Sequence, residues 1–490
     1  MSRSIRYCRL KSASPTSLQS PQVSIEVVIV PGIPRHTIVG LAQGAVKESL
    51  DRIRAAILSS GFRFPRGAIT VNLAPADTRK EGTAFDLPIA LGILAADGQI
   101  ATMPSDALHW LTMGELALNG RMRPVKGVMP ALVNAMRQEV RHVVLPSGNV
   151  PETGAFADLA VCPADSLVDA IEALAGLRVP LGRLSTQSST SVSTASDFAQ
   201  VLGQLGAIRA LEVAAVGNHN VLLSGPPGCG KTLMARSYPS ILPVWNTPEA
   251  LETTCIRSLR RPGIAVMTSR PFRSPHHSVS EAGMLGGGNP VRPGEVSLAH
   301  NGVLFMDELP EFSRDVLEGL REPLEEHSVA ISRAGGMERF PARFQLLAAM
   351  NPCPCGYAGV EDRPCRCSAR DLSRYRSRLS GPLLDRIDIH VVVPQVRIGD
   401  LSAEQPKTSQ KISARVQAGR AVLSSTKPVM GQETEEALIR ASTSLRLSMR
   451  GVERCRSLAR SIAALDGSNR VARHHISEAM RYCRKITDQS

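Results

Sequence analysis

The spacing of apolar and polar residues predicts a mixed strand and helix region at the start of the chain. Apolar residues alternate with polar ones over 23–30, and a second strand is predicted at 68–73. Over 45–60 they recur at helical spacing, and residues 86–96 have the pattern of a buried helix. This alternation of strands and helices predicts an α/β or α+β domain over 1–180.

A stretch rich in serine and threonine, residues 181–196, follows this domain. Such a stretch cannot bury a core, so we expect a linker to a second domain over 197–395. Short apolar strands are predicted in that domain at 221–223, 303–306 and 344–350. Helical patterns then predict a small helical lid within residues 396–490.

Two short β-like pieces around a Gly-Gly pair predict a hairpin over residues 329–344. Three basic residues lie on it: Arg333, Arg339 and Arg343. Two interpretations stay open, a solvated basic hairpin and a pore loop that follows the phosphates of a nucleic acid.

Composition adds a preference for a polyanionic partner. The chain has 490 residues, a formal net charge of +13 and a pI near 9.6, which favours a partner such as DNA. Aromatic residues make up only 3%, so we expect contacts to phosphates rather than base stacking. No apolar run approaches the roughly 18 residues of a membrane span, and no membrane contact is expected.

The N-terminal residues and the distribution of cysteines indicate the cellular location of the protein. The first 25 residues contain no acid and several arginines and serines, but they lack a clear apolar face. We therefore expect a frayed start rather than a transit peptide. Six of the ten cysteines are scattered, and no apolar signal segment is present, which argues against a secreted disulfide scaffold. A cytoplasmic protein is expected.

The strongest chemical signal is a glycine-rich loop between the strand 221–223 and a predicted helix. Its residues are Gly225, Pro226, Pro227, Gly228, Cys229, Gly230, Lys231 and Thr232. In a loop with this spacing, backbone N–H groups surround phosphate oxygens, the lysine reaches the β- and γ-phosphates, and the threonine hydroxyl can bind Mg²⁺. The sequence therefore predicts a site for a nucleoside triphosphate such as ATP, with Mg²⁺.

Polar residues end two of the apolar strands that follow. Asp307 can hold Mg²⁺, and Glu308 can polarise an attacking water as general base. An apolar strand that ends in Asp-Glu is a weak signal alone, but one about 75 residues after a phosphate loop is a strong one. Asn351 ends the next strand and fits either a γ-phosphate sensor or the turn chemistry of an Asn-Pro pair.

Four cysteines form two close pairs: Cys353, Cys355, Cys365 and Cys367. Four thiolates suit tetrahedral Zn²⁺, which would contribute folding energy to a small loop. The spacing within each pair is tighter than usual for zinc, so reduced thiols and an iron–sulfur cluster stay as alternatives. A catalytic zinc is not expected because no general base lies nearby in the sequence.

Residues 80–92 and 114–127 resemble the two motif regions of the Lon-protease-like fold. That family carries a nucleophilic serine in the first region and an activating lysine in the second. Matched position by position, these fall on Ala84 and Met129, neither of which can do nucleophilic chemistry. Without a serine partner, Lys126 is expected to be a surface charge. The resemblance thus implies a non-proteolytic scaffold for assembly or DNA contact.

Four motifs together resemble the magnesium-chelatase-like AAA+ ATPases. They are the phosphate loop, Met306-Asp-Glu-Leu-Pro-Glu, Ala-Met350-Asn-Pro-Cys-Pro-Cys-Gly and Ser380-Gly-Pro-Leu-Leu-Asp-Arg-Ile-Asp. With the Lon-like domain, the match is closest to the ComM/YifB group and covers nearly the whole chain. The resemblance implies an α/β P-loop AAA+ core, a Lon-protease-like α+β N-terminal domain and a C-terminal helical lid.

The resemblance also implies roles for individual residues. Lys231 and Thr232 hold phosphate and Mg²⁺, Asp307 is a metal ligand, Glu308 the base, Asn351 the first sensor, Arg386 the arginine finger and Arg450 the second sensor. An arginine finger completes the site of a neighbouring subunit and can be worth about 10³–10⁵ in rate. A homo-oligomeric ring, expected to be a hexamer, is therefore implied.

The group's implied activity is that of an ATP-driven motor on single-stranded, duplex or branched DNA, a branch-migration helicase in natural transformation. A chelatase-type remodeller of a protein partner is the alternative. The Lon-like domain and the net positive charge favour the first. A Lon-type protease is a third class, against which Ala84 and Met129 argue.

Overall fold

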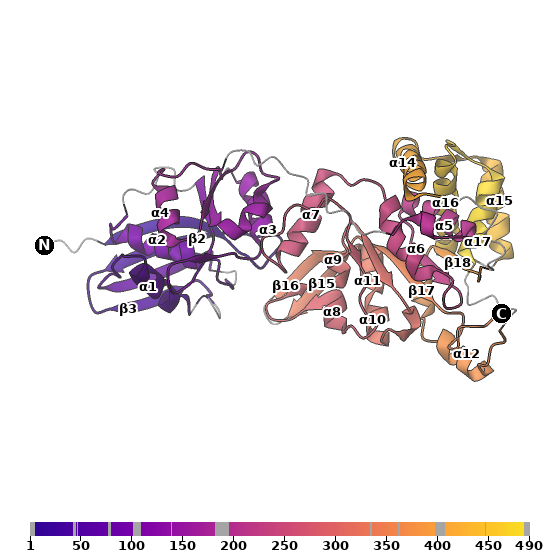
Figure 1. Ribbon diagram of the computed structural model, residues 1–490, viewed down its shortest axis with the longest axis horizontal. Helices are drawn as coiled ribbons and strands as arrows, with labels where there is room; N and C mark the ends of the chain where they lie inside the picture. Colours follow the sequence, from indigo (N-terminus) through magenta and orange to yellow (C-terminus); the bar gives the residue numbers. More distant parts are fainter. Residues whose placement is uncertain are drawn as a thin grey trace.

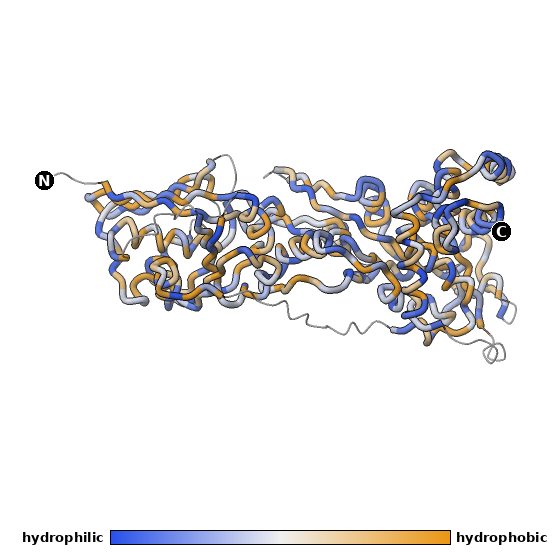
Figure 2. Tube along the Cα trace, turned by 90° about the horizontal axis from the view of Figure 1, so that it is seen from above, coloured by the Kyte–Doolittle hydropathy of each residue, from blue (hydrophilic) through white to orange (hydrophobic). Residues whose placement is uncertain are grey.

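The structure is a computed structural model that describes residues 5–42, 46, 48–76, 80–100, 109–138, 140–181, 196–333, 336–360, 363–396, 407–445 and 447–484. Three parts lie in a row along its longest axis: an N-terminal sheet with its helices, a central sheet, and a C-terminal group of helices (Figure 1). The same row is seen from above (Figure 2). Only residues 181 and 196 of the expected linker belong to the described residues, and the expected domain limits stay predictions.

The N-terminal part is built on a seven-stranded sheet in the order β3-β4-β2-β1-β5-β8-β9. Its strands are β1 (Arg6–Ala13), β2 (Gln22–Val30), β3 (Arg35–Val39), β4 (Ala68–Ala74), β5 (Trp110–Thr112), β8 (His142–Pro146) and β9 (Ala160–Ala164). The pairs β1–β2 and β2–β4 are antiparallel, and the other neighbours are parallel. A short antiparallel pair, β6 (Glu115–Leu116) and β7 (Met122–Arg123), lies outside this sheet.

Four helices accompany this sheet: α1 (Ser49–Ser59), α2 (Asp86–Ala96), α3 (Val128–Arg137) and α4 (Leu167–Leu174). Helix α2 packs on β1 and β2, and almost every one of its residues is buried. A helix that is apolar on all sides has to lie in such a place, so the buried helix expected at 86–96 is confirmed.

The expectation of a frayed start is wrong for residues 6–13. They form β1, an interior strand that pairs with β2 along its whole length and touches β5 on its other side. Cys8 and Leu10 are buried on one face, whereas their neighbours are partly or fully exposed. The alternation is present but weak, because arginine, lysine and serine occupy positions that a typical strand gives to β-branched residues.

The central part is a five-stranded sheet in the order β11-β14-β17-β10-β18, parallel throughout. Its strands are β10 (Val221–Ser224), β11 (Phe272–Arg273), β14 (Val303–Met306), β17 (Gln345–Met350) and β18 (Ile389–Val392). Strands β10, β14 and β17 are buried at every residue. Parallel strands covered on both faces are continuously apolar, which is why these three segments are recognisable in the sequence.

The helices of the central part are α5 (Leu205–Gly217), α6 (Lys231–Ser237), α7 (Thr247–Ser258), α8 (Glu281–Leu285), α9 (Glu295–Leu298), α10 (Arg314–Gly319), α11 (Arg321–Glu326), α12 (Ala369–Arg376) and α13 (Gly381–Leu384). The expected hairpin is confirmed as β15 (Ser328–Arg333) paired with β16 (Gly336–Pro341). Strands β12 (Gly286–Gly287) and β13 (Arg292–Pro293) form a second short pair.

The C-terminal part is helical, as expected for a lid. Its helices are α14 (Ser409–Ser425), α15 (Gln432–Ser444), α16 (Met449–Leu465) and α17 (Arg473–Cys483), and β19 (Val429–Met430) pairs with β20 (Arg470–Val471). Helices α14 and α16 pack against α5 of the central part, so the two parts share one apolar core. In the described part of the chain, no helix combines the length and the apolar character that crossing a bilayer requires.

A buried carboxylate joins the N-terminal part to the central part. Glu152 is 0% exposed and accepts hydrogen bonds from the Ser258 hydroxyl at 2.6 Å, from the Gly263 N–H at 2.8 Å and from the Met129 N–H at 3.1 Å. Asn149 donates a fourth at 2.7 Å. Burial raises the pKa of this carboxyl, and these donors oppose that rise. The joint therefore ties α3 to α7.

Candidate functional site

The glycine-rich loop runs from the carboxyl end of β10 to the first turn of α6. Gly228 and Gly230 have φ of +79° and +94°, the left-handed region in which glycine is favoured. A side chain at Gly225 would lie 2.2 Å from the Val393 carbonyl oxygen, so the loop passes close to the strand beside it. The strand, loop and helix of a phosphate-binding motif are therefore all present.

The Lys231 side chain lies across this loop, 8% exposed. Its Nζ donates hydrogen bonds to the carbonyl oxygens of Gly225 at 2.6 Å and Pro226 at 2.9 Å, and to Asn351 Oδ1 at 3.2 Å. The ammonium group is thus held between the loop and the end of β17. These contacts place the ammonium group where it would meet a phosphate bound in the loop.

Thr232, in the first turn of α6, meets Asp307, which directly follows β14. The Thr232 hydroxyl donates a hydrogen bond of 2.8 Å to Asp307 Oδ2, and the other Asp307 oxygen accepts one from the Glu308 N–H at 3.0 Å. A hydroxyl beside a carboxylate is the hard oxygen pair that Mg²⁺ prefers. The two residues fit a Mg²⁺ site next to the phosphate loop.

Glu308 follows directly, with its side chain 57% exposed and its backbone at φ +53°. A left-handed backbone is uncommon outside glycine and is found where a site dictates the conformation. His277 Nδ1 lies 3.9 Å from Glu308 Oε2. The carboxylate is therefore exposed to solvent at the same sheet edge as Asp307, where a water can reach it.

The topology explains why these residues converge. Strands β14, β17 and β10 are neighbours and parallel, so their carboxyl ends reach the same edge of the sheet. That edge carries the phosphate loop, Asp307, Glu308 and Asn351. Ligands of open parallel sheets bind at this edge, so the structure brings the expected phosphate loop together with Asp307, Glu308 and Asn351.

Arg386 lies at the opposite edge. Its carbonyl accepts a hydrogen bond of 2.9 Å from Asn220 Nδ2, and Asn220 precedes β10, whereas the phosphate loop follows that strand. Four residues of strand span about 13 Å. The Arg386 side chain, 11% exposed, instead binds Glu325 Oε1 at 2.5 Å. The structure therefore does not bring Arg386 to the phosphate loop of its own chain.

Arg450 binds the same carboxylate. Its Nη1 lies 3.0 Å from Glu325 Oε1, and its side chain is 69% exposed. The hydrogen bond from Arg386 and then its charge, together with Arg450, lower the pKa of Glu325. The expected finger and the expected second sensor are thus neighbours, away from the phosphate loop of their own chain.

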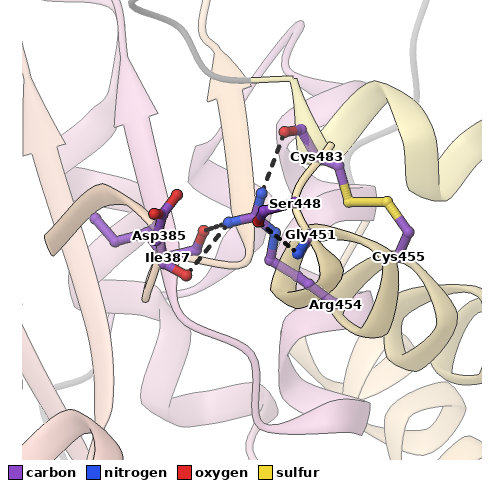
Figure 3. Close-up of a disulfide and its surroundings, with 7 residues drawn as sticks. All are labelled: Asp385, Ile387, Ser448, Gly451, Arg454, Cys455 and Cys483. Atoms are coloured by element: carbon purple, nitrogen blue, oxygen red, sulfur yellow. Dashed lines mark hydrogen bonds between the residues drawn. A yellow bond between two sulfur atoms is a disulfide. The ribbon is translucent and has the colours of Figure 1, made fainter. Parts of the chain in front are cut away.

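A buried arginine of the lid holds the backbone on both sides of Arg386 (Figure 3). Arg454 Nη1 donates to the Ile387 carbonyl at 3.0 Å and to the Asp385 carbonyl at 3.5 Å, and Nη2 reaches the Cys483 carbonyl at 3.5 Å. Cys483 forms a disulfide with Cys455, which joins α17 to α16. Arg454 therefore connects the lid to the segment that carries Arg386.

The four expected cysteines gather in one cluster. The distances between their Sγ atoms are 3.3 Å for Cys353–Cys355 and 3.6 Å for both Cys355–Cys365 and Cys353–Cys365. The four ligand atoms all lie within 4.8 Å of one another. Zinc held tetrahedrally by thiolates at about 2.3 Å needs sulfurs about 3.8 Å apart, so the cluster fits Zn²⁺.

The Lon-like positions show no nucleophile. Ala84 is buried, and Met129 is buried with its N–H bound to Glu152. A cavity of about 550 Å³ lies between the N-terminal and central parts, lined by Ala84, Lys126 and Arg292 among others. Burial and then the charge of Arg292 lower the pKa of Lys126, which is exposed as expected. The structure provides no Ser–Lys pair at these two positions.

Sequence reasoning missed the residues that support the site from a distance. Glu325, Arg454 and the Glu152–Ser258 pair are absent from every motif. No local signal marks them, because each acts through a partner tens to hundreds of positions away.

Three family models match the chain, all described as the magnesium chelatase subunit ChlI. The central one matches residues 197–401, a second one residues 25–149, and the C-terminal one residues 410–483. The first covers all five strands of the central sheet, the second lies within the N-terminal part, and the third spans most of α14 and all of α15, α16 and α17.

Individual proteins match over nearly the whole chain. Competence protein ComM of Haemophilus influenzae is 40% identical, with 98% of this chain and 97% of ComM covered. YifB of Salmonella typhimurium is 40% identical over 95% of this chain and 94% of YifB. The DNA replication licensing factor Mcm6 of Drosophila melanogaster is 25% identical over 40% of this chain and 26% of Mcm6.

Proposed function

Because this chain belongs to the magnesium chelatase subunit ChlI family, and within it to the group of ComM and YifB, we propose that it is a ring-forming motor on DNA. The family makes it an ATPase that uses ATP and Mg²⁺. The observation that best supports a ring is that Arg386 and the phosphate loop lie at opposite edges of the same sheet.

The residues at the phosphate-loop edge carry out hydrolysis. The N–H groups of the loop and Lys231 bind the phosphates, and Lys231 leaves its carbonyl partners for the γ-phosphate when ATP arrives. Mg²⁺, held by Thr232 and Asp307, would neutralise phosphate charge. Glu308 accepts the proton of the attacking water, and Asn351 Oδ1 orients it.

Hydrolysis is completed by a neighbouring copy. A finger about one strand length from its own phosphate loop cannot reach its own nucleotide, so it serves the next subunit of a head-to-tail ring. Arg450 shares Glu325 with Arg386 and faces the same neighbour. A closed ring of this kind, which we propose to be a hexamer, lies in the cytoplasm and assembles from identical chains.

DNA is the proposed substrate for three reasons. The chain carries a net charge of +13, the β15–β16 hairpin bears basic residues such as Arg339, and the relatives include a competence protein and a replication licensing factor. Branch migration during uptake of DNA is the activity that these features support best. A protein client is the second candidate, favoured because all matching family models describe a chelatase subunit.

The cysteine cluster is proposed to hold structural zinc. Two reasons support a structural role: four thiols fill a tetrahedral site and leave no open position, and Glu308 lies on a different loop. Elemental analysis of the purified protein should give about one zinc per chain. Iron in its place would identify a cluster, and no metal would leave reduced thiols.

ATP hydrolysis tests the proposed substrate. Rates should be measured for the wild type and Arg386→Ala without DNA and with single-stranded, duplex and four-way-junction DNA. DNA should stimulate ATP hydrolysis by the wild type, most strongly as the four-way junction. Arg386→Ala should lose this stimulation. Hydrolysis indifferent to every DNA would reject a DNA motor and favour a protein client.

A further inference from the structure

The segment 351–378, here called the cysteine loop, lies against the phosphate loop. A side chain at Gly356 would come within 2.8 Å of Pro227 Cδ, so the two loops are in contact. The Tyr375 hydroxyl of α12 donates a hydrogen bond of 3.2 Å to the Asn351 carbonyl. The cysteine loop is therefore fixed at the edge of the sheet where ATP binds.

The cysteine loop is basic. Over 351–378 the sequence has three acids, Glu361, Asp362 and Asp371, and six arginines: Arg363, Arg366, Arg370, Arg374, Arg376 and Arg378. Arg378 pairs with Glu311 at 2.7 Å, and Arg363 lies over the Tyr357 ring. Arg366, Arg370 and Arg374 are exposed and form no ion pair with a described carboxylate. Arg374 acts electrostatically on Asp371 of the same helix, and the charges of Arg366 and Arg370 are left for an acidic partner.

Arg386, at the opposite edge of the same sheet, lines an acidic cavity of about 880 Å³. Five acids line it: Glu281, Glu318, Glu322, Glu325 and Glu326. Arg321 and Arg386 are the basic residues on its wall, paired at 2.7 Å with Glu318 and at 2.5 Å with Glu325. Glu281 and Glu322 are exposed and form no ion pair with a described cation. Arg450 also binds Glu325, and Arg339 lies 4.0 Å from Glu326, so the negative charge left in the cavity is that of Glu281 and Glu322.

We propose that the cysteine loop of one copy docks into the acidic cavity of its neighbour. The inference rests on the proposed ring: when Arg386 of one copy reaches the phosphate loop of the next, the edge with the cavity faces the edge with the loop. Opposite charges meet in that arrangement and only in one direction around the ring. The contact therefore gives the head-to-tail order its specificity.

Helix α12 suits the loop to this role. Arg370 and Arg374 are already displayed on this ordered helix, so the loop loses little conformational entropy when it docks. The loop also touches Pro227, so docking and nucleotide binding act on adjoining residues. The cavity contains Glu325, the carboxylate that holds Arg386. Both halves of the contact thus adjoin the composite ATP site.

Charge reversal tests the contact without touching the ATP site. The loop variant is Arg370→Glu with Arg374→Glu, and the cavity variant is Glu281→Arg with Glu322→Arg. Arg440→Glu and Glu436→Arg, at exposed positions of α15, are the matched controls. Ring assembly is measured by sedimentation velocity with Mg²⁺ and a non-hydrolysable ATP analogue, and binding of a fluorescent nucleotide checks that each variant is folded.

Each double variant should assemble at least about tenfold more weakly than the wild type, and the four-residue combination should regain most of that loss. The controls should assemble normally. Normal assembly of both double variants would overturn the docking contact but not the ring. The same holds if the four-residue variant assembles no better than the weaker of the two double variants. A wild type that stays monomeric with nucleotide would reject the ring and the contact together.

Discussion

At the residue scale, the site is arranged before nucleotide binds. Lys231 is buried and held by two loop carbonyls and Asn351, so the binding of phosphate exchanges hydrogen bonds rather than ordering a free side chain. Glu308 lies on a left-handed backbone, and its carboxylate is exposed to solvent. In the proposed function, nucleotide binding and hydrolysis therefore depend on different residues of the same sheet edge.

Glu308→Gln should separate nucleotide binding from ATP hydrolysis. The amide keeps the shape of the side chain but cannot accept a proton, so the hydrolysis rate should fall by about 10²–10⁴. Nucleotide affinity should stay near that of the wild type, since Lys231 and the loop are unchanged. Paired measurements of turnover and of fluorescent-nucleotide binding check this, and a variant that still hydrolyses at half the normal rate would remove Glu308 from the role of base.

Arg454 is a positioning residue, because it holds the carbonyls on both sides of Arg386. Arg454→Met keeps most of the apolar stem but releases this segment. Turnover should fall by about tenfold or more, while the KM for ATP and the affinity for nucleotide stay constant. Arg440→Met, at an exposed position of α15, is the control. An equal loss of affinity and turnover would mean that Arg454 supports the fold alone.

At the element scale, runs of apolar residues in the sequence predicted the buried parallel strands of the central sheet. The strands that end in Asp307 and Asn351 are continuously apolar because helices cover both faces, and their common direction brings these residues to the phosphate loop. Strand β1 was not predicted because arginine and lysine occupy much of it. The roles of Arg454 and Glu325 could not be predicted from the sequence, because their contacts form only when the lid and α11 are packed.

The contact between the cysteine loop and the phosphate loop gives a prediction with an internal control. Gly356 and Gly359 have φ of +88° and +79°, so alanine strains the backbone similarly at both, by about 1–2 kcal/mol. Only at Gly356 does the new methyl group meet Pro227, at 2.8 Å. Gly356→Ala should therefore weaken ATP binding several-fold, whereas Gly359→Ala should not. Isothermal titration with ATP measures both, and equal affinities would show that the two loops are uncoupled.

At the scale of the whole molecule, one carboxylate links the N-terminal part to the central part. Glu152 accepts four hydrogen bonds, two of them from the central part, and lies beside the position that the Lon-like resemblance assigns to a catalytic lysine. The resemblance predicted a scaffold without proteolysis, and the structure gives that region a joining role. Motif reasoning missed the joint because Glu152 and Ser258 are 106 positions apart.

Glu152→Ala should loosen this joint. It leaves buried donors without an acceptor, each of which costs about 1–3 kcal/mol. The melting temperature should fall, and limited proteolysis should release an N-terminal fragment faster. Glu172→Ala, on the surface of α4, should change stability by less than about 0.5 kcal/mol. Unchanged proteolysis of the Glu152 variant would show that the two parts are held together by other contacts.

The central claim, an ATPase whose site is shared between copies, is tested most directly by mixing two inactive variants. Lys231→Ala keeps Arg386 but loses phosphate binding, and Arg386→Ala keeps the phosphate loop but loses the finger. In an equal mixture, about one interface in four pairs an intact loop with an intact Arg386. The mixture should hydrolyse ATP although neither variant does alone. A mixture that forms joint rings yet stays inactive would contradict it.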